Sequence, residues 1–263
     1  MFDNIVKKNE LIKGFEELGL KKGNIVIVHS SLSSFGYVEG GATTVIDSLK
    51  EIITENGILA MPSFPAFIGG EYGIAEKEII FYVRISPTAM GKISDTFWRK
   101  EEVKRSLHPT HSVAAWGKEK EWLISGHENC ICSCGENTPL HKICKENGKI
   151  LLIGIGHNSN TTLHTIEDIN GAPTRSCLIF YPKVIDYEGQ ILTVPLHPHF
   201  PGLLRKYEKA DEICKENKIQ NEIKIGNSLC KLIEAGKLFN ILSKFVKEDP
   251  LFLIDKNYYA ELK

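Results

Sequence analysis

The sequence predicts an α/β fold with a mixed, partly antiparallel sheet. Three observations support this prediction. Short β-branched runs alternate along the chain with stretches of helical periodicity, which is the pattern of a layered α/β protein. The first predicted strand, helix and strand follow one another closely enough to form a βαβ unit. Two later strand-like runs flank Glu188-Gly189, so a hairpin there adds antiparallel neighbours.

Composition narrows the class of protein. The chain has 263 residues, which fits one large domain. Its 32 basic and 33 acidic residues nearly cancel, which argues against a DNA-binding surface. With 42% hydrophobic residues the sequence is neither a disordered tail nor a coiled coil. No apolar run is long enough to span a bilayer or resembles a signal peptide, so seven cysteines indicate reduced thiols in the cytoplasm.

The first part of the chain predicts helix, strand, helix and strand in that order. Residues 1–19 carry the alternation of charged and apolar residues of an amphipathic helix. The β-branched run 24–29 predicts a buried strand. A second helix is expected over 41–55, because its apolar residues lie on one stripe and Asn56-Gly57 follows it. Residues 58–61 predict another buried strand.

The middle of the chain is less regular. Residues 65–84 are predicted to form a loop or lid over the site. Ser86 is expected to cap a helix that reaches about residue 100, with Pro87 in its first turn. Residues 112–116 predict a strand, and 149–156 are the most strand-like run in the sequence.

The last part combines helices with the hairpin. A helix is predicted over 161–169, because the polar cluster before it offers capping side chains. The two strands of the hairpin are expected at 177–185 and 190–196. Beyond about residue 200 we expect a mainly helical C-terminal part, with helices over 202–217 and 235–247 around a short strand at 222–225.

The strongest local pattern for chemistry is the pair His164 and Glu167, at the start of a helix that follows the best strand. Residues three apart share a helix face, so the imidazole and the carboxylate can meet. A neighbouring carboxylate raises the basicity of a histidine and fixes its tautomer, which suits a general base. The alternative is an exposed pair on a solvated helix turn.

A second pattern is the polar loop from His29 to Ser34, between a strand and a helix. Its backbone N–H groups could bind an anion with help from the helix dipole, or the loop could simply cap the helix. The loop has neither the glycines of a dinucleotide-binding turn nor the lysine of a P-loop. The sequence also has no G-x-S-x-G motif, so a serine nucleophile is not supported.

Two further clusters leave alternatives open. In the stretch 105–113, Arg105 with Lys104 could hold a phosphate, and the histidines could be ligands, catalysts or hydrogen-bonding loop residues. The cysteines of the run 130–134, with His127, His141 and Cys144 nearby, suggest a zinc-stabilised binding module without catalysis. Their spacing of one residue is not the usual zinc pattern, and unpaired cysteines in a reduced cytoplasm explain them better.

Four stretches of the sequence carry a resemblance. They are VHSSLSSFGYVEGGATTVIDSLKEIITENGILAMPSF, SPTAMGKISDTFW, RSLHPTHSVAAWG and GKILLIGIGHNSNTTLHTIED, in that order. Together they resemble the aminoglycoside 3-N-acetyltransferase family, from about Leu11 to Lys247. The resemblance implies one domain over residues 1–263, folded as a three-layer α/β/α sandwich.

The resemblance also implies a reaction. Acetyl-CoA would be the co-substrate, no metal would take part, and the acetyl group would pass directly to an amine of a small amino sugar. His164 would be the general base that removes a proton from the attacking amine, and Glu167 would orient that histidine or hold the substrate ammonium. The need for a base is physical, because an ammonium has no lone pair with which to attack a thioester.

Binding residues follow from the same resemblance. The coenzyme phosphates are expected at Ser30, Ser31 and Leu32. A second stretch is expected to line the coenzyme and its thioester, and its residues are Arg105, His108, Pro109, Ser112 and Val113. Glu71, Asp168 and Glu167 are the carboxylates expected to meet the acceptor. No nucleic acid or membrane partner is expected, and a homodimer is one option for the assembly.

The sequence departs from the family pattern at the acceptor side. Many members carry a longer, acidic segment where this chain has only residues 65–82. Where the family often has Phe-Asp-Pro, this chain reads Phe81-Tyr82-Val83, so an aspartate is missing. A polycationic acceptor needs acidic partners. The alternative acceptor is an amino sugar carried on a nucleotide, as in surface-polysaccharide biosynthesis.

Overall fold

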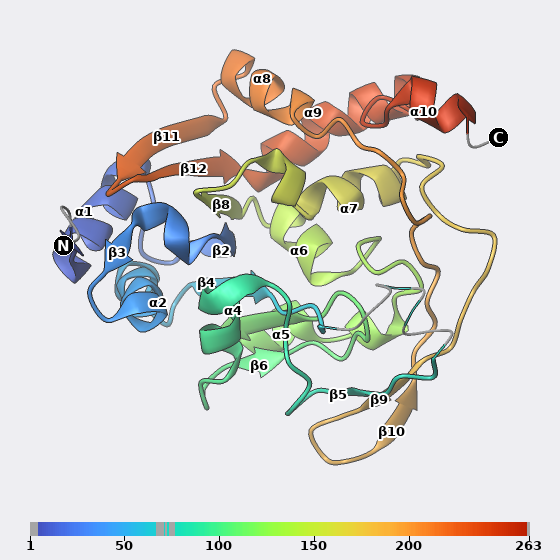
Figure 1. Ribbon diagram of the computed structural model, residues 1–263, viewed down its shortest axis with the longest axis horizontal. Helices are drawn as coiled ribbons and strands as arrows, with labels where there is room; N and C mark the ends of the chain where they lie inside the picture. The colour runs from blue at the N-terminus through green and yellow to red at the C-terminus, as the bar shows by residue number, and fades with distance from the viewer. Residues whose placement is uncertain (1–4, 67–70, 72, 74–76, 262–263) are drawn as a thin grey trace.

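A seven-stranded mixed sheet forms the centre of the structure, a computed structural model that describes residues 5–66, 71, 73 and 77–261. Its strands lie in the order β11 (Gln220–Ile225), β12 (Ser228–Glu234), β8 (Lys149–Ile153), β2 (Ile25–Ser30), β4 (Ile58–Pro62), β7 (Val113–Trp116) and β6 (Lys104–Arg105) (Figure 1). The central strands β8, β2 and β4 are parallel, and the outer strands pair antiparallel. The predicted mixed sheet is confirmed.

The predicted βαβ unit is confirmed as well. Helix α2 (Gly41–Ile53) connects β2 to β4, which pair in parallel. Its buried stripe contains the apolar residues that the periodicity indicated: Val45, Ile46, Leu49, Ile52 and Ile53. The preceding helix is shorter than predicted. α1 (Lys8–Leu18) begins only at Lys8, because β1 (Ile5–Val6) is extended and pairs with β3 (Tyr37–Val38).

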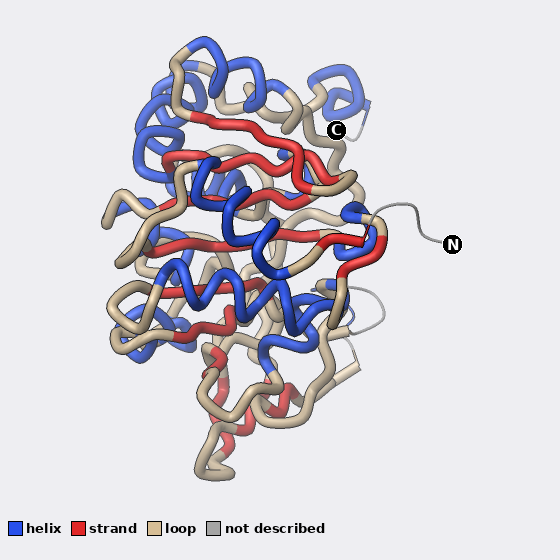
Figure 2. Tube along the Cα trace, turned by 90° about the vertical axis from the view of Figure 1, so that its left-hand side faces the viewer, coloured by secondary structure: helices blue, strands red, loops and turns tan. Residues whose placement is uncertain are grey.

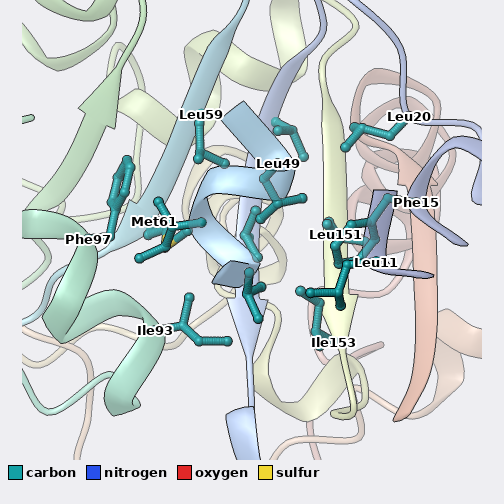
Figure 3. Packing of buried hydrophobic residues seen from close by; sticks show 14 of the residues in the cluster. Leu11, Phe15, Leu20, Leu49, Leu59, Met61, Ile93, Phe97, Leu151 and Ile153 are labelled. Atoms are coloured by element: carbon teal, nitrogen blue, oxygen red, sulfur yellow. The ribbon is translucent and has the colours of Figure 1, made fainter. Parts of the chain in front are cut away.

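Helices cover both faces of the sheet, which confirms the three-layer α/β/α arrangement. Along β2, Val26 and Val28 belong to one buried cluster and Ile27 to the other, because side chains alternate across a strand. The first cluster also contains residues of α1, α2 and α4 (Gly91–Trp98), and part of it is drawn in Figure 3. The second contains residues of α5 (Lys120–Ile124), α6 (Pro139–Lys145), α7 (Thr162–Ile169), α8 (Lys209–Glu216) and α9 (Ala235–Glu248).

The predicted hairpin exists but lies in a different sheet. Strands β9 (Lys183–Ile185) and β10 (Ile191–Thr193) pair antiparallel, and β5 (Phe81–Tyr82) joins them in parallel. This small sheet lies below the central one, as Figures 1 and 2 both show. The antiparallel strands of the central sheet come instead from β6, β7, β11 and β12. Strand β12 was not predicted, because the polar residues Ser228 and Lys231 interrupt its apolar pattern.

Two predicted helices begin later than expected. Ser86 is not a helix cap, and α4 starts at Gly91, because the segment before it pairs with another part of the chain. Thr88 Oγ1 and the Ala89 N–H both donate to the Phe64 carbonyl, which holds residues 86–90 outside the helix. α8 starts at Lys209 and not at residue 202, since Arg205 forms a bridge with Ile254.

The C-terminal part contains the predicted short strand, within β11, but also the unpredicted strand β12, so it is less helical than expected. β11 and β12 extend the central sheet, and α9 follows them as predicted before the short α10 (Lys256–Glu261). Of the predicted lid, residues 67–70, 72 and 74–76 lie outside the described part of the chain. Among the described residues, none of the helices has the length and hydropathy that crossing a bilayer requires.

Candidate functional site

A cavity of about 350 Å³ opens at the carboxyl ends of the parallel strands. His29 and Ser30 line it from β2, Pro62 from β4, and Ile155 from just after β8. From β2 the chain first forms β4 on one side and later forms β8 on the other side, so the direction in which strands are added reverses at β2. Open α/β sheets usually bind their ligands at such a switch point. The beginnings of α4 and α7 border the same cavity, so the positive ends of two helix dipoles lie beside it.

His164 and Glu167 meet at the edge of this cavity, as their spacing predicts. Both lie on α7, and His164 Nδ1 is 3.2 Å from Glu167 Oε2. The Glu167 side chain is completely buried, whereas 21% of the His164 side chain is exposed and it lines the cavity. The alternative of an exposed pair on a solvated turn is therefore wrong.

Tyr207 and Arg205, which no sequence pattern indicated, complete the group around His164 and Glu167. The Tyr207 hydroxyl donates to Glu167 Oε2 at 2.6 Å and lies 2.9 Å from His164 Nδ1. Arg205 Nε donates to the same carboxylate oxygen at 3.2 Å. Both residues lie in the segment before α8, where the periodicity suggested a helix. No local pattern connects them with α7, which is about forty residues earlier in the chain.

Electrostatics make His164 a neutral proton acceptor. Burial, together with the nearby His199, lowers the pKa of His164 to about 4. Burial alone would raise the pKa of Glu167, but His164 and Arg205 lower it, so this carboxyl is ionised. With Glu167 ionised, the hydrogen-bond network assigns the ring proton to Nδ1. Among the described residues, both hydrogen-bond contacts of the His164 ring use Nδ1, which leaves Nε2 as the basic nitrogen.

Glu71, from the predicted lid, lies in a second network beside this group. Its Oε2 accepts the His199 backbone N–H at 2.5 Å and lies 3.0 Å from His199 Nδ1. Its Oε1 accepts the Ser133 hydroxyl at 2.9 Å and is 3.2 Å from His111 Nδ1. Glu71 is therefore tied to three other segments of the chain.

Asp168 belongs to the same network, and its side chain is completely buried. Arg175 binds it with two hydrogen bonds, of which the one from Nε measures 2.9 Å. Burial would raise the pKa of Asp168, but His199 and Arg175 lower it to about 2. The structure thus brings the three predicted acceptor carboxylates, Glu71, Glu167 and Asp168, close to His164. It also gives each of them a cationic or histidine partner from the protein itself.

The predicted coenzyme loop lies partly on the cavity. Ser30 lines it, and the chain continues through Ser31 into the short 3₁₀ turn Leu32–Phe35. The Ser31 N–H donates to the Ile153 carbonyl, so this backbone donor is already used. The Ser31 hydroxyl lies 3.1 Å from that of Ser33 and remains on the surface side of the loop.

Arg105 does not have the position expected of a phosphate-binding residue. Only 2% of it is exposed, and its guanidinium lies 4.8 and 4.5 Å from the ring centres of Phe81 and Trp98. It donates to the Ser63 carbonyl at 2.6 Å and to the Ser86 carbonyl at 2.7 Å, so its donors serve the fold. This use corrects the expectation from the sequence, in which an arginine beside a lysine suggested an anion site.

A substitution tests this role. Arg105→Met keeps the length of the side chain but leaves the buried carbonyls of Ser63 and Ser86 without donors. We expect it to lower the free energy of unfolding by about 3 kcal/mol or more, measured by urea denaturation. The KM for acetyl-CoA, the co-substrate that the resemblance implies, should stay within about threefold at a temperature where the variant is folded. Unchanged stability with a strongly raised KM would restore the phosphate role.

The other residues of the same stretch lie behind the cavity and not on it. His108 is fully buried, its Nδ1 accepts the backbone N–H groups of Thr110 and His111, and its ring stacks on His127. Ser112 donates to the Ser106 carbonyl. Pro109 and Val113 are buried as well. Among the described residues, these side chains support the wall of the site and do not form its surface.

One group of described side chains brings potential metal ligands within 4.8 Å of one another: Glu71, His111 and His199. Arg175 Nη1 lies 3.4 Å from His199 Nδ1, so a cation already occupies this place and we interpret the group as an ion-pair network. The zinc-site cysteines form no such group in the described chain. Cys130 donates to the carbonyls of Gly126 and Glu136, and burial raises its pKa to about 11, whereas zinc requires a thiolate.

The chain matches known proteins over most of its length. The family model for aminoglycoside 3-N-acetyltransferase matches residues 27–247. The SPbeta prophage-derived aminoglycoside N(3')-acetyltransferase-like protein YokD of Bacillus subtilis is 37% identical over 263 residues, which cover 92% of this chain and 93% of that protein. Aminoglycoside N(3)-acetyltransferase IV of Salmonella is 29% identical over 251 residues, with 94% and 90% covered.

A solved structure extends the comparison to three dimensions. It is a mutant of aminoglycoside acetyltransferase AAC(3)-IVa in complex with a gentamicin. Its TM-score with this chain is 0.83 at 27% sequence identity, and the match covers 99% of this chain and 95% of that one. The sheet order and both helical layers described above are therefore those of a known fold.

Proposed function

Because the chain belongs to the aminoglycoside 3-N-acetyltransferase family, we propose that it transfers an acetyl group from acetyl-CoA directly to an amine of an amino sugar. One observation carries the proposal. A neutral histidine, His164, lies on a cavity at the carboxyl ends of the parallel strands, with its Nδ1 held by Glu167 and Tyr207. This arrangement is that of a general base.

The reaction follows from this geometry. His164 Nε2 takes a proton from the acceptor ammonium, and the free amine attacks the carbonyl carbon of the thioester. The imidazolium that forms is stabilised by the ionised Glu167 at 3.2 Å. The nitrogen of the tetrahedral intermediate loses its second proton to water. The intermediate then collapses as the carbon–sulfur bond breaks, and the leaving thiolate takes the first proton back from His164. An amide and free coenzyme A result, and no acyl-enzyme is needed.

The coenzyme is proposed to bind in the cavity beside His164. Ser30, Ser31 and Leu32 would meet its phosphates, and the start of α7 would supply the positive end of a helix dipole. The cavity wall combines apolar side chains with neutral polar residues, among them Asn158, Ser159 and Thr161. Such groups suit the amide-rich arm of the coenzyme.

The acceptor is proposed to be an aminoglycoside or a related amino sugar, in keeping with the family and with the gentamicin complex of AAC(3)-IVa. A second candidate is an amino sugar on a nucleotide, and one observation favours it. The three acceptor carboxylates, Glu71, Glu167 and Asp168, already pair with arginines and histidines of the protein. These carboxylates are thus partly neutralised before a polycation arrives.

An acceptor panel separates the candidates. Thiol release from acetyl-CoA is measured with gentamicin, with apramycin and with a nucleotide-linked amino sugar that has one amine. We expect acetylation of an aminoglycoside, and the second candidate predicts that the single-amine acceptor has at least a tenfold higher kcat/KM, about 1.4 kcal/mol. If neither these acceptors nor other amino sugars cause thiol release, N-acetyl transfer is contradicted.

We further propose that residues 1–263 form one domain that works in the cytoplasm, with a homodimer as one option for its assembly. Both hydrophobic clusters pack on the same central sheet, which supports one folding unit. All seven cysteines are free thiols, and a reducing compartment that supplies acetyl-CoA suits them. Sedimentation of the purified protein gives the oligomeric state.

A further inference from the structure

We propose that His199 is a positioning residue for His164. Held as a cation between two carboxylates, it keeps the neighbouring base in the neutral form that accepts the proton of the substrate. This inference rests on the proposed acetyl transfer and adds to it a residue outside the four matched stretches of the sequence.

The carboxylates hold His199 from both sides of its ring. Its Nδ1 lies 3.0 Å from Glu71 Oε2, and its Nε2 lies 3.5 Å from Asp168 Oδ1. Only 10% of the side chain is exposed, so solvent screens these charges little. Carboxylates near both nitrogens favour the positively charged ring. Arg175 Nη1, 3.4 Å from His199 Nδ1, opposes this charge, but its guanidinium is itself paired with Asp168.

Protonation of His199 balances the charges around it. Glu71 and Asp168 bring two negative charges, and Arg175 brings one positive charge through its pair with Asp168. His111, whose ring centre is 5.8 Å away, also contacts Glu71. Burial by itself lowers the pKa of His199, but Glu71 and Asp168 raise it above its ordinary value.

The backbone fixes His199 in this place. Its N–H donates to Glu71, and it forms a bridge with Arg175. On either side, Arg175 binds the His197 carbonyl, and the Phe200 N–H donates to the Thr174 carbonyl at 2.7 Å. The ring is therefore held by main-chain contacts as well as by its ion pairs, and this support fixes its position beside His164.

His199 acts on His164 through space. The two ring centres are only 4.5 Å apart, which is direct ring contact. The other groups that face His164 are Glu167, Tyr207 and Arg205. A positive ring at this distance opposes protonation of His164, so the free enzyme keeps a vacant Nε2. It also destabilises the imidazolium that forms during the reaction, which favours return of the proton to the leaving thiolate.

The test is the pH dependence of kcat/KM for His199→Gln. Loss of the positive charge makes His164 easier to protonate, so we expect the acid limb to move to higher pH by about one unit. An NMR titration of the His164 ring, in the absence of substrates, should show its pKa moving upward by the same amount. His197→Gln is the matched control, because it removes a loop contact, to the Ser176 carbonyl, that does not face His164. It should leave the limb in place.

A second variant protects the test against misfolding. Glu71→Gln removes the charge that keeps His199 protonated, and we expect it to move the limb in the same direction. An unmoved limb in both active variants, or an equal shift in His197→Gln, overturns the proposal. Absence of acetyl transfer in the wild type instead contradicts the proposed function, so the two failures are distinguishable.

Discussion

Replacement of His164 by alanine is expected to lower kcat by about 10³-fold, within the range that general-base catalysis contributes. In the described part of the chain, no neighbouring group can replace the base: Glu167 is completely buried, burial raises the pKa of the Tyr207 hydroxyl, and His199 is held as a cation by Glu71 and Asp168. The KM for acetyl-CoA should change little, because the imidazole acts in the transition state. Thiol release from acetyl-CoA at saturating acceptor measures the effect.

Two controls accompany this variant. Added imidazole should restore part of the activity of His164→Ala, because it can enter the space left beside the cavity and act as the base. His141→Ala should keep wild-type turnover, since that partly buried histidine packs on Phe239 and is not among the residues that line the cavity. Full turnover by His164→Ala would remove the histidine from the mechanism.

The second large effect is expected for Glu167→Gln, with a loss of about 10²-fold in kcat. The carboxylate stabilises the imidazolium that forms on His164 and sets the ring proton on Nδ1. An amide of the same size removes the charge and can donate to Nδ1, which favours the wrong tautomer. Since Arg205 would then lose its ionised partner, a lower melting temperature is also expected.

A matched variant separates charge from hydrogen bonding at this place. Tyr207→Phe removes the 2.6 Å hydrogen bond to Glu167 but leaves its carboxylate. We expect a smaller loss in kcat, about tenfold or less. If Tyr207→Phe costs as much as Glu167→Gln, or if Glu167→Gln retains wild-type kcat while folded, the carboxylate has no electrostatic role and the account of the base is wrong.

The parts of the fold that depend on local patterns could be predicted. The βαβ unit follows from β-branched runs on either side of a helical stripe, and His164 meets Glu167 because i, i+3 residues share a helix face. Strand β12 was not predicted, because its alternation of polar and apolar residues is weak and it is stabilised by pairing with β8. The helix expected at Ser86 starts at Gly91, since contacts with Phe64 outweigh a good capping sequence.

The parts of the site that depend on distant segments could not be predicted. Tyr207 and Arg205 reach Glu167 only because the loop before α8 passes beside α7. Arg105 resembled a phosphate ligand in the sequence, but burial against two aromatic rings turns it into a hydrogen-bonding centre of the fold. The meaning of a charged residue thus follows from its burial, which a single sequence does not show.

The most direct test of the account measures two products in one reaction. Purified wild type and His164→Ala are each incubated with acetyl-CoA and an amino-sugar acceptor, and both free thiol and acetylated amine are quantified. The account predicts equal amounts of thiol and acetylated amine from the wild type, and almost none of either from the variant. Thiol release without an acetylated acceptor, or equal product from both proteins, would contradict direct acetyl transfer with His164 as the base.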